Sequence, residues 1–335
     1  MWLAVIAVLI GLAILVWSAD IFIDGATTLA NSLGVPSFLI GVVILGLGTS
    51  APEMVVSVLA ALEGSPELAL GNAYGSNIMN IALVLGTTAL ISPIIIHKSI
   101  VKRDLPLLLV ITLLAAWQLR DGQLSQSDGI TLLLGLGAVL IFQIVINLRS
   151  SRQEDKKIAS KNNENNENKE NKENKDRQSV GIFRGLASLI IGMSILILSS
   201  RAIVWGAVEL ATFWGLSELI IGLTVVAVGT SLPELVASLS AARKGEYDMA
   251  LGNIIGSNIF NTLGVVGLAA LIAPISADPI ILSRDVLVMG LLTLLLVVLC
   301  VFAYIKKRSF GRTSGAILLL FFIGYSILLT QTFNL

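Results

Sequence analysis

Charged side chains are scarce in this chain, and their scarcity excludes an ordinary soluble fold. Charged residues make up 13% of the 335 residues, apolar residues make up 55%, and the mean hydropathy is +0.89. A soluble domain carries about 25% charged residues. Much of the charge is also confined to positions 149–177, which hold nine Lys or Arg and seven Asp or Glu residues. The rest of the chain is apolar enough to face lipid.

Cysteine and histidine are also nearly absent, with Cys300 and His97 as the single examples. One cysteine excludes a disulfide framework and a thiolate metal site. A metal site built on imidazole usually needs more than one histidine, so we expect His97 to be a solvated loop residue. The basic and aromatic stripe of a nucleic-acid-binding protein is missing as well. We therefore expect no cofactor and no nucleic-acid partner.

Apolar runs recur along the whole chain and approach the roughly 20 residues that a helix needs to cross a bilayer. The first run has no basic segment before it, so we interpret it as a membrane helix and not as a signal peptide. The sequence predicts an all-α polytopic membrane protein with ten transmembrane helices. They are expected at 2–30, 35–62, 66–92, 104–119 and 126–148, then at 181–210, 216–243, 247–273, 284–304 and 314–332.

The two halves of the chain repeat each other. Residues 40–94 align without a gap with residues 221–275 at a constant offset of 181, and 28 of the 55 positions are identical. Internal repeats of this kind indicate a duplicated structural unit. We therefore divide the chain into a first five-helix half at 1–148, a polar linker at 149–180 and a second five-helix half at 181–335.

An odd number of helices in each half gives the two halves opposite orientations in the membrane. Lys and Arg collect in cytoplasmic loops, and placing the N-terminus outside puts nine of them inside and three outside, without counting the linker. We expect both termini outside the cell (inner) membrane and the linker in the cytoplasm. Inverted repeats are typical of secondary transporters, whose site lies near the membrane midplane.

The linker is rich in Asn, Lys and Glu. It has too few apolar residues to offset the entropy lost on ordering, so we expect a mobile tether. A regulatory segment is the alternative.

Two glutamates interrupt apolar spans at the same position of the repeat. Glu53 ends the segment GTSAPE, and Glu234 ends its counterpart GTSLPE. A carboxylate at membrane depth costs about 2.5 kcal/mol or more, so such residues are rare and usually functional. Because the two are related by the repeat, we predict that both belong to one site.

The residues around each glutamate can supply further oxygen ligands. Pro52 has no amide hydrogen and removes a helical bond to the carbonyl of Gly48, so we expect the helix to be broken there and to free nearby carbonyls. Calcium prefers six to eight oxygen ligands. The predicted oxygen donors are Gly46, Thr49, Ser50 and Glu53 in the first half and Ala227, Thr230, Ser231 and Glu234 in the second.

A second repeated motif, GNAYGSNIMN and GNIIGSNIFN, adds polar side chains that are spaced i, i+4 and share one helix face. Its glycines form the small-xxx-small pattern that allows close helix packing. The residues predicted to complete the site are Ser76, Asn80, Ser257 and Asn261, with hydrogen bonding between helices as the alternative for the two asparagines.

The charge of the site indicates exchange. Two carboxylates balance one divalent cation. An empty site would leave two like charges in apolar surroundings, which favours the uptake of protons or sodium ions. An empty, doubly charged site should also resist crossing the bilayer. We therefore expect obligatory exchange, against either sodium or protons.

In both motifs, and in their order, the chain resembles the alpha-1 (40–94) and alpha-2 (221–275) repeats of the sodium/calcium exchangers, within the cation/calcium antiporter superfamily. The resemblance implies exchange of cytosolic calcium for external sodium, or for protons in sister branches, by alternating access. It implies calcium ligands at Glu53, Glu234 and the carbonyls of Thr49 and Thr230, and sodium sites at Gly46, Ser50, Ser76, Ala227, Ser231 and Ser257.

One position departs from part of that family. Some members carry an aspartate at one of the two positions equivalent to Asn80 and Asn261, whereas both are asparagine here. The site therefore has one acid fewer than in those members.

We predict a calcium/sodium antiporter with no catalytic residues and no obligatory protein partner. The alternatives are exchange of calcium or another divalent cation such as manganese against protons, and a gated cation channel. An intramembrane enzyme is disfavoured. Two glutamates without a histidine or a nucleophile-base pair could suit an aspartyl-type dyad, but such sites use aspartates and need no dense shell of oxygen ligands. Outside the site, we expect Asp20 and Asp24 at a solvated helix end, or alternatively on the ion path, and Asp104 and Asp285 at helix N-termini.

Overall fold

The computed structural model describes residues 1–159, 170–215, 227–277 and 279–332, and these residues are almost entirely helical. Long helices with short connections are what the apolar runs predict. The first half contains α1 (Trp2–Leu33), α2 (Ser37–Ile40), η1 (Gly41–Leu45), α3 (Gly46–Leu62), α4 (Glu67–Met79), η2 (Asn80–Leu85), α5 (Gly86–Ile91), η3 (Ile100–Asp104), α6 (Leu105–Gln118), η4 (Leu119–Asp121), β1 (Gln123–Leu124) and α7 (Gln126–Ala159).

The described part of the second half repeats the order of the helices, but its short strand comes before the fourth helix of the half and not after it. It contains α8 (Glu170–Phe213), α10 (Ala227–Thr230), α11 (Leu232–Arg243), α12 (Tyr247–Ile259), η6 (Phe260–Val265), α13 (Val266–Ile272), β2 (Ile275–Ser276), η7 (Ile281–Val286), α14 (Leu287–Ile305) and α15 (Arg312–Thr332).

Eight helical stretches of the described chain are long and apolar enough to cross a membrane. The other two expected helices appear as 100–118, whose first five residues include three charged ones, and as α10 with α11, whose expected N-terminal part at 216–226 lies outside the described residues. The count of ten fits this arrangement and stays a prediction. The eight stretches are Trp2–Leu33, Ser37–Leu62, Glu67–Ile91, Gln126–Asn147, Val180–Phe213, Tyr247–Ile272, Ile281–Ile305 and Arg312–Leu329.

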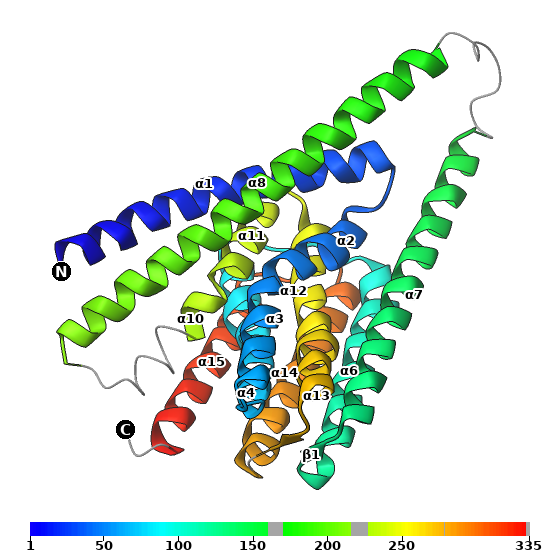
Figure 1. Cartoon of the computed structure of the whole chain (residues 1–335). Coiled ribbons are helices and arrows are strands. Elements are labelled where there is room, and N and C mark those ends of the chain that lie inside the picture. The colour runs from blue at the N-terminus through cyan, green and yellow to red at the C-terminus, as the bar shows by residue number, and fades with distance from the viewer. Residues whose placement is uncertain (160–169, 216–226, 278, 333–335) are drawn as a thin grey trace.

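The two halves are interleaved around one hydrophobic core (Figure 1). The last helix of the first half, α7, packs against α13 of the second half, and α15 packs against α5 of the first half. The large core cluster accordingly takes residues from both halves, for example Tyr74 and Ile78 from α4 and Ile255 and Ile259 from α12. Neither half could bury this surface alone.

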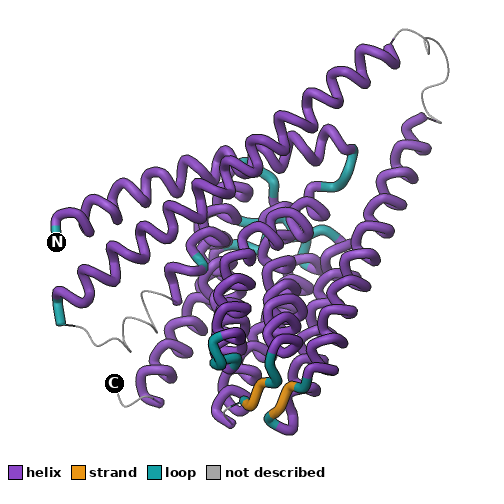
Figure 2. Tube along the Cα trace, in the orientation of Figure 1, coloured by secondary structure: helices purple, strands orange, loops and turns teal. Residues whose placement is uncertain are grey.

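Helices α1 and α8 lie apart from that core and pack along each other (Figures 1 and 2). Glycines permit this close approach: a Cβ atom at Gly25 would lie 2.5 Å from the backbone nitrogen of Leu189, and one at Gly192 would lie 2.5 Å from that of Phe22. Two smaller apolar clusters join this pair to α11 and to its neighbours. Small residues at helix interfaces are a common device of membrane bundles.

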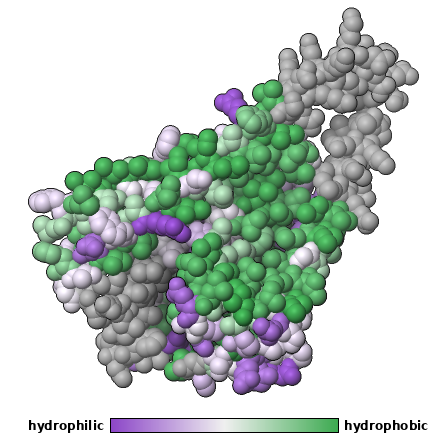
Figure 3. Space-filling view, in the orientation of Figure 1, coloured by the Kyte–Doolittle hydropathy of each residue, from purple (hydrophilic) through white to green (hydrophobic). Residues whose placement is uncertain are grey.

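Apolar side chains cover most of the face drawn in Figure 3, and hydrophilic side chains gather at its lower end. Leu134 on α7 and Leu198 on α8, for example, are 70% and 65% exposed. Such a surface suits a lipid environment and not water.

Two short strands depart from the all-α expectation. β1 pairs with β2 in an antiparallel register that places Gln123 opposite Ser276. Ile94 forms a single β-bridge with Phe310 at the corresponding place of the other half, since Ile94 and Ile275 are repeat mates. The bridges satisfy backbone groups where the chain leaves a helix, and two-residue strands leave no periodic pattern in the sequence.

The linker is helical at both ends, since α7 continues to Ala159 and α8 begins at Glu170. Extending an existing helix avoids the cost of nucleation, and Glu and Lys are good helix formers. The central part of the expected tether, 160–169, lies outside the described residues.

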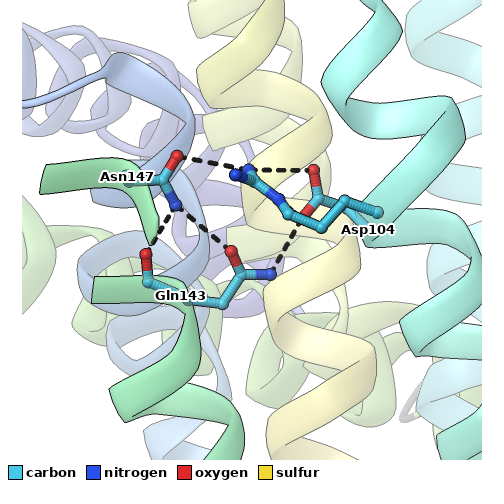
Figure 4. Close-up of polar contacts among 4 residues, drawn as sticks. Asp104, Gln143 and Asn147 are labelled. Atoms are coloured by element: carbon cyan, nitrogen blue, oxygen red, sulfur yellow. Dashed lines mark hydrogen bonds and ion pairs between the residues drawn. The ribbon is translucent and has the colours of Figure 1, made fainter. Parts of the chain in front are cut away.

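Asp104 acts in a buried polar network and not mainly as a helix-dipole partner. Its carboxylate accepts hydrogen bonds from Arg103 Nε at 2.8 Å and from Gln143 Nε2 of α7 at 2.9 Å (Figure 4). Asn147 accepts a bond from the same arginine at 3.2 Å. In the second half Asp285 pairs with Arg284 and accepts a bond from Tyr325 of α15. Each Arg-Asp pair thus ties the fourth helix of its half to the fifth.

Candidate functional site

Six buried polar side chains mark the site because their oxygen and nitrogen atoms lack hydrogen-bond partners. They form three repeat pairs: Ser50 with Ser231, Glu53 with Glu234, and Asn80 with Asn261. All six are at most 2% exposed. Within the described chain, few other buried side-chain atoms are unpaired. Leaving such groups unpaired is expensive, so their concentration in repeat-related positions indicates a ligand that needs oxygen donors.

The helix that carries Glu53 does not have the predicted break. α3 runs without interruption from Gly46 to Leu62 with Pro52 inside it, so the expected unwinding at this motif is wrong for the first half. A single proline removes one helical bond, and the bonds on either side can hold the helix together. The helical hydrogen-bond pattern changes instead before the motif, in the π-helical turn η1, where the Gly46 N–H bonds to the carbonyl of Gly41, five residues earlier.

The helix that carries Glu234 does have a break. α10 ends at Thr230, Ser231 lies in a turn with φ −90° and ψ 5°, and α11 begins at Leu232. Pro233 falls in the first turn of α11, where its missing N–H is of no consequence. The prediction of a broken helix is therefore confirmed in the second half.

π-helical turns position the two asparagines, and the sequence did not predict them. η2 begins at Asn80, and η6 spans Phe260 to Val265 and includes Asn261. A π-turn inserts an extra residue into the helix and changes the direction of the side chains around it, and such turns are frequent at functional sites. The π-turns occur at nearly equivalent positions of the two halves, and in both halves the asparagine carboxamide is buried and unpaired.

Thr49 joins the two halves through its hydroxyl group. Its Oγ1 donates to the carbonyl of Leu45 at 3.1 Å or to Asn253 Oδ1 at 3.2 Å, and lies 3.1 Å from Ser257 Oγ. These partners occupy the hydroxyl, which leaves the main-chain carbonyl as the group of Thr49 that could bind an ion. Thr49 also lies within electrostatic reach of the Glu234 carboxylate.

Asn72 and Asn253 hold the glutamate-bearing helices in place, a role that sequence reasoning missed. Asn72 Nδ2 donates to the carbonyl of Glu53 at 3.2 Å and to Ser57 Oγ at 3.0 Å. Asn253 Nδ2 makes the same pair of bonds, to the carbonyl of Glu234 at 3.4 Å and to Ser238 at 2.9 Å. The available signal was the identity of both Asn and both Ser across the repeat.

The remaining predicted residues lie on the helices α3, α4, α10 and α12. Ser76 and Ser257 are buried. Gly46 packs against α12, since a Cβ atom there would lie 2.9 Å from Gly256 Cα. Thr230 ends α10, and Ala227 begins it, although the side chain of Ala227 lies outside the described residues.

Close helix packing is confirmed for one of the two glycine pairs. A Cβ atom at Gly252 would lie 2.7 Å from the carbonyl oxygen of Phe38, and one at Gly256 would clash with the carbonyl of Val42. At Gly71 and Gly75, a Cβ atom would meet no described atom within 4 Å, so close packing is not found there among the described residues. The repeat mates of Phe38 and Val42, at 219 and 223, lie outside those residues.

The chemistry of the site suits a hard cation. Glu53 and Glu234 lie close enough to each other for their charges to interact. Nowhere in the described ranges do three or more His, Cys, Asp or Glu residues gather into a metal-binding group. The donors beside the two carboxylates are therefore hydroxyl, carboxamide and carbonyl oxygens, the set that calcium accepts. His97 lies away from these residues, exposed and 2.7 Å from Asp248, as its loop position predicted.

Comparison with known proteins agrees with this chemistry. The sequence profile of the family described as sodium/calcium exchanger protein matches residues 3–145 and 184–331. The chain is 42% identical over 329 residues to the putative antiporter CaxA of Alkalimonas amylolytica, covering 98% of this chain and 99% of that protein. It is 31% identical to the sodium/calcium exchanger MaX1 of Methanosarcina acetivorans, covering 96% and 97% of the two chains.

Solved structures give the same result. A structure of the sodium-calcium exchanger NCX_Mj superimposes with a TM-score of 0.78 at 33% sequence identity, covering 96% of each chain. At this coverage, the likeness extends over both halves of the chain.

Proposed function

The chain belongs to the sodium/calcium exchanger family of membrane cation antiporters, and from this premise we propose that it exchanges calcium for sodium by alternating access. The observation that carries the proposal is the set of six buried, unpaired side chains that includes Glu53 and Glu234. Two carboxylates would balance one divalent cation, and the neighbouring hydroxyls and carboxamides would replace its water shell. Sodium ions would use the same oxygens after calcium leaves.

We assign the ligands by the chemistry of each residue. The carboxylates of Glu53 and Glu234 and the carbonyls of Thr49 and Thr230 would hold calcium. Asn80 and Asn261 would add carboxamide oxygens, because both have unpaired side-chain atoms. The sodium positions would use Gly46, Ser50 and Ser76 on one side and Ala227, Ser231 and Ser257 on the other.

The proposal includes the arrangement in the membrane. Five helices in each of the halves 1–148 and 181–335 would place the halves in opposite orientations, with both termini outside and the linker 149–180 inside. The distribution of Lys and Arg supports this orientation. Opposite orientations allow the same motif to face each side of the membrane in turn.

The counter-ion is tested by calcium uptake into vesicles that contain the purified protein. One set is loaded with sodium and diluted into potassium, and a second set carries only a pH gradient. We expect uptake in the first set and none in the second. Uptake driven by the pH gradient alone would replace sodium by protons as the counter-ion.

The same vesicles separate an antiporter from a channel. An antiporter requires a counter-ion on the opposite side, so calcium flux should stop when sodium is removed from the vesicle interior. Calcium flux that continues down its own gradient without sodium or protons would contradict exchange and would indicate a channel.

A further inference from the structure

The repeat extends beyond the two motifs into the helices that lie outside the main core. At the same offset of 181, Gly11 and Gly25 of α1 correspond to Gly192 and Gly206 of α8, and Ser18 corresponds to Ser199. The contacts correspond as well: each serine donates to the carbonyl three residues earlier, at 2.9 and 3.0 Å. Any residue of α1 can therefore be compared directly with its mate on α8.

Lys244, just after α11, ties that helix to α1. Its Nζ lies 2.6 Å from Asp24 Oδ1, donates to the main-chain carbonyl of Asp20 at 2.9 Å, and lies 3.9 Å from Asp20 Oδ1. Ser240, one turn earlier on α11, donates to the same Asp20 carboxylate at 2.5 Å. Lys244 thus forms ion pairs with both aspartates, although its single positive charge balances only one of the two carboxylates.

The repeat mates of this ion pair carry the opposite charges. Lys244 corresponds to Glu63, just after α3, and Asp20 corresponds to Arg201 on α8. A Lys-Asp pair between α11 and α1 is therefore matched by a possible Glu-Arg pair between α3 and α8. In the structure both Glu63 and Arg201 are exposed, and neither side chain forms an ion pair or hydrogen bond with any described residue.

The packing of α1 with α11 also differs from the packing of α3 with α8. α11 packs along α1, and Ala237, Ala241 and Ala242 of α11 join the apolar cluster of α1. α3 meets α8 over a shorter stretch. We call the contact between α1 and α11 the α1–α11 seam and the contact between α3 and α8 the α3–α8 seam. The two seams lead to opposite ends of the bundle, because α3 descends to its junction with α4 while α11 rises from α10 toward α12 (Figure 1).

We propose that these are two alternating latches: Lys244 with Asp20 and Asp24 holds the α1–α11 seam closed in one state, and Glu63 with Arg201 holds the α3–α8 seam closed in the other. The proposal rests on alternating access, in which inverted halves exchange conformations. The structure has the first latch formed and the second apart. Exposed ion pairs are weak, so each latch would bias the equilibrium between the states and not lock it.

The two latches are unequal. Asp24 and Ser240, which add bonds to the Lys244 latch, have the apolar mates Trp205 and Leu59. The Lys244 latch therefore has the larger number of polar ties. We infer that the state in which the α1–α11 seam is closed is favoured when no gradient is applied.

The test uses a cysteine reporter that does not depend on transport. Ser238 lies between Glu234 and Lys244 and is fully buried in this state, in which the α1–α11 seam is closed. Ser238→Cys is made in a Cys300→Ser background, and labelling by a membrane-impermeant thiol reagent is followed in vesicles without gradients. In the Lys244→Glu variant we expect labelling of Ser238→Cys to rise by about three- to tenfold.

Three further variants complete the test. Arg243→Glu, at an exposed neighbour of Lys244, changes the same charge without touching the latch and should leave the labelling rate of Ser238→Cys unchanged. Arg201→Glu weakens the opposite latch and should lower this labelling rate, opposite to the effect of Lys244→Glu. The charge swap Glu63→Arg with Arg201→Glu should restore the parental rate.

The outcomes separate this proposal from the proposed function. If Arg243→Glu acts like Lys244→Glu, or if the charge swap does not restore labelling, the latches are wrong even if calcium exchange is confirmed. If labelling follows the latches while no cation gradient drives calcium uptake, the latches stand and the assignment of the transported ions fails.

Discussion

The two repeats carry the same motif in different conformations. In the first half GTSAPE lies within the continuous helix α3, whereas in the second half GTSLPE is divided by the turn at Ser231. Thr49 of the first motif bonds to Asn253 and Ser257 of the opposite half. Nearly identical sequences therefore have at least two accessible conformations, and the surrounding helices select between them.

This difference explains how a duplicated unit could open to either side in turn. If the halves exchange conformations, the continuous helix becomes the divided one and the reverse, and the site remains in the middle. Such a change needs two packings of similar free energy, and a duplicated sequence provides them without further design. The comparison can be tested by changing equivalent residues in each half.

The largest effect is expected at the two glutamates, where the halves should behave alike. Glu53→Gln and Glu234→Gln each remove one of the charges that balance a divalent cation but preserve the side-chain shape. Loss of a buried charge partner costs about 2–5 kcal/mol, roughly a 30-fold to several-thousand-fold loss of calcium affinity. Calcium uptake should be abolished in both variants, measured in sodium-loaded vesicles.

Glu67→Gln is the matched control, because Glu67 is an exposed glutamate at the start of α4. It should transport at the parental rate. Near-normal transport by either site variant, with Glu67→Gln also normal, would exclude that glutamate from the site.

Much of this architecture was accessible from the sequence. The apolar runs located the helices within a few residues, as at 247–273, where the structure has continuous helix from Tyr247 to Ile272. The offset of 181 identified Glu53 and Glu234, because a charge in an apolar span is unusual and a repeated one more so. The apolar runs and the repeated glutamate can both be found in a sequence, because each depends on the type of residue at a position and not on exact backbone geometry.

Features that depend on exact backbone geometry were not accessible. The π-turns at Asn80 and Asn261 leave no pattern, since apolar residues surround them as in an α-helix. Pro52 and Pro233 predicted two breaks, yet tertiary packing produced only the second. Lys244 is separated from Asp24 by 220 positions in the sequence and from Asp20 by 224 positions, so no local pattern could reveal its contacts with α1.

An intermediate effect, and an unequal one, is expected at the asparagines that hold the glutamate-bearing helices. Asn253 is fully buried and bonds to Glu234, Ser238 and Thr49, whereas Asn72 is partly buried and bonds to Glu53 and Ser57. Asn253→Ala should weaken calcium affinity by about 1–2 kcal/mol, roughly 5- to 30-fold, because it leaves buried partners unpaired. Asn72→Ala should cost about half as much.

The measurement is the apparent KM for calcium beside the yield of monodisperse protein. A positioning role predicts that KM rises while the folded yield is nearly unchanged, and that Ser238→Ala gives a smaller rise than Asn253→Ala. Equal losses of yield and activity, without a change in KM, would mean that Asn253 acts only in folding.

The smallest effect is expected at the prolines, and it tests the exchange of conformations most directly. A proline within a helix is unfavourable, whereas one in the first turn is tolerated. Pro52→Ala should therefore favour the conformation seen here, with α3 continuous, and Pro233→Ala should favour the opposite one, each by about 0.5–1 kcal/mol. Labelling of the Ser238→Cys reporter should fall in Pro52→Ala and rise in Pro233→Ala, each by roughly two- to fivefold. Shifts in the same direction would mean that the two halves do not exchange conformations, because each proline would then respond only to its own helix.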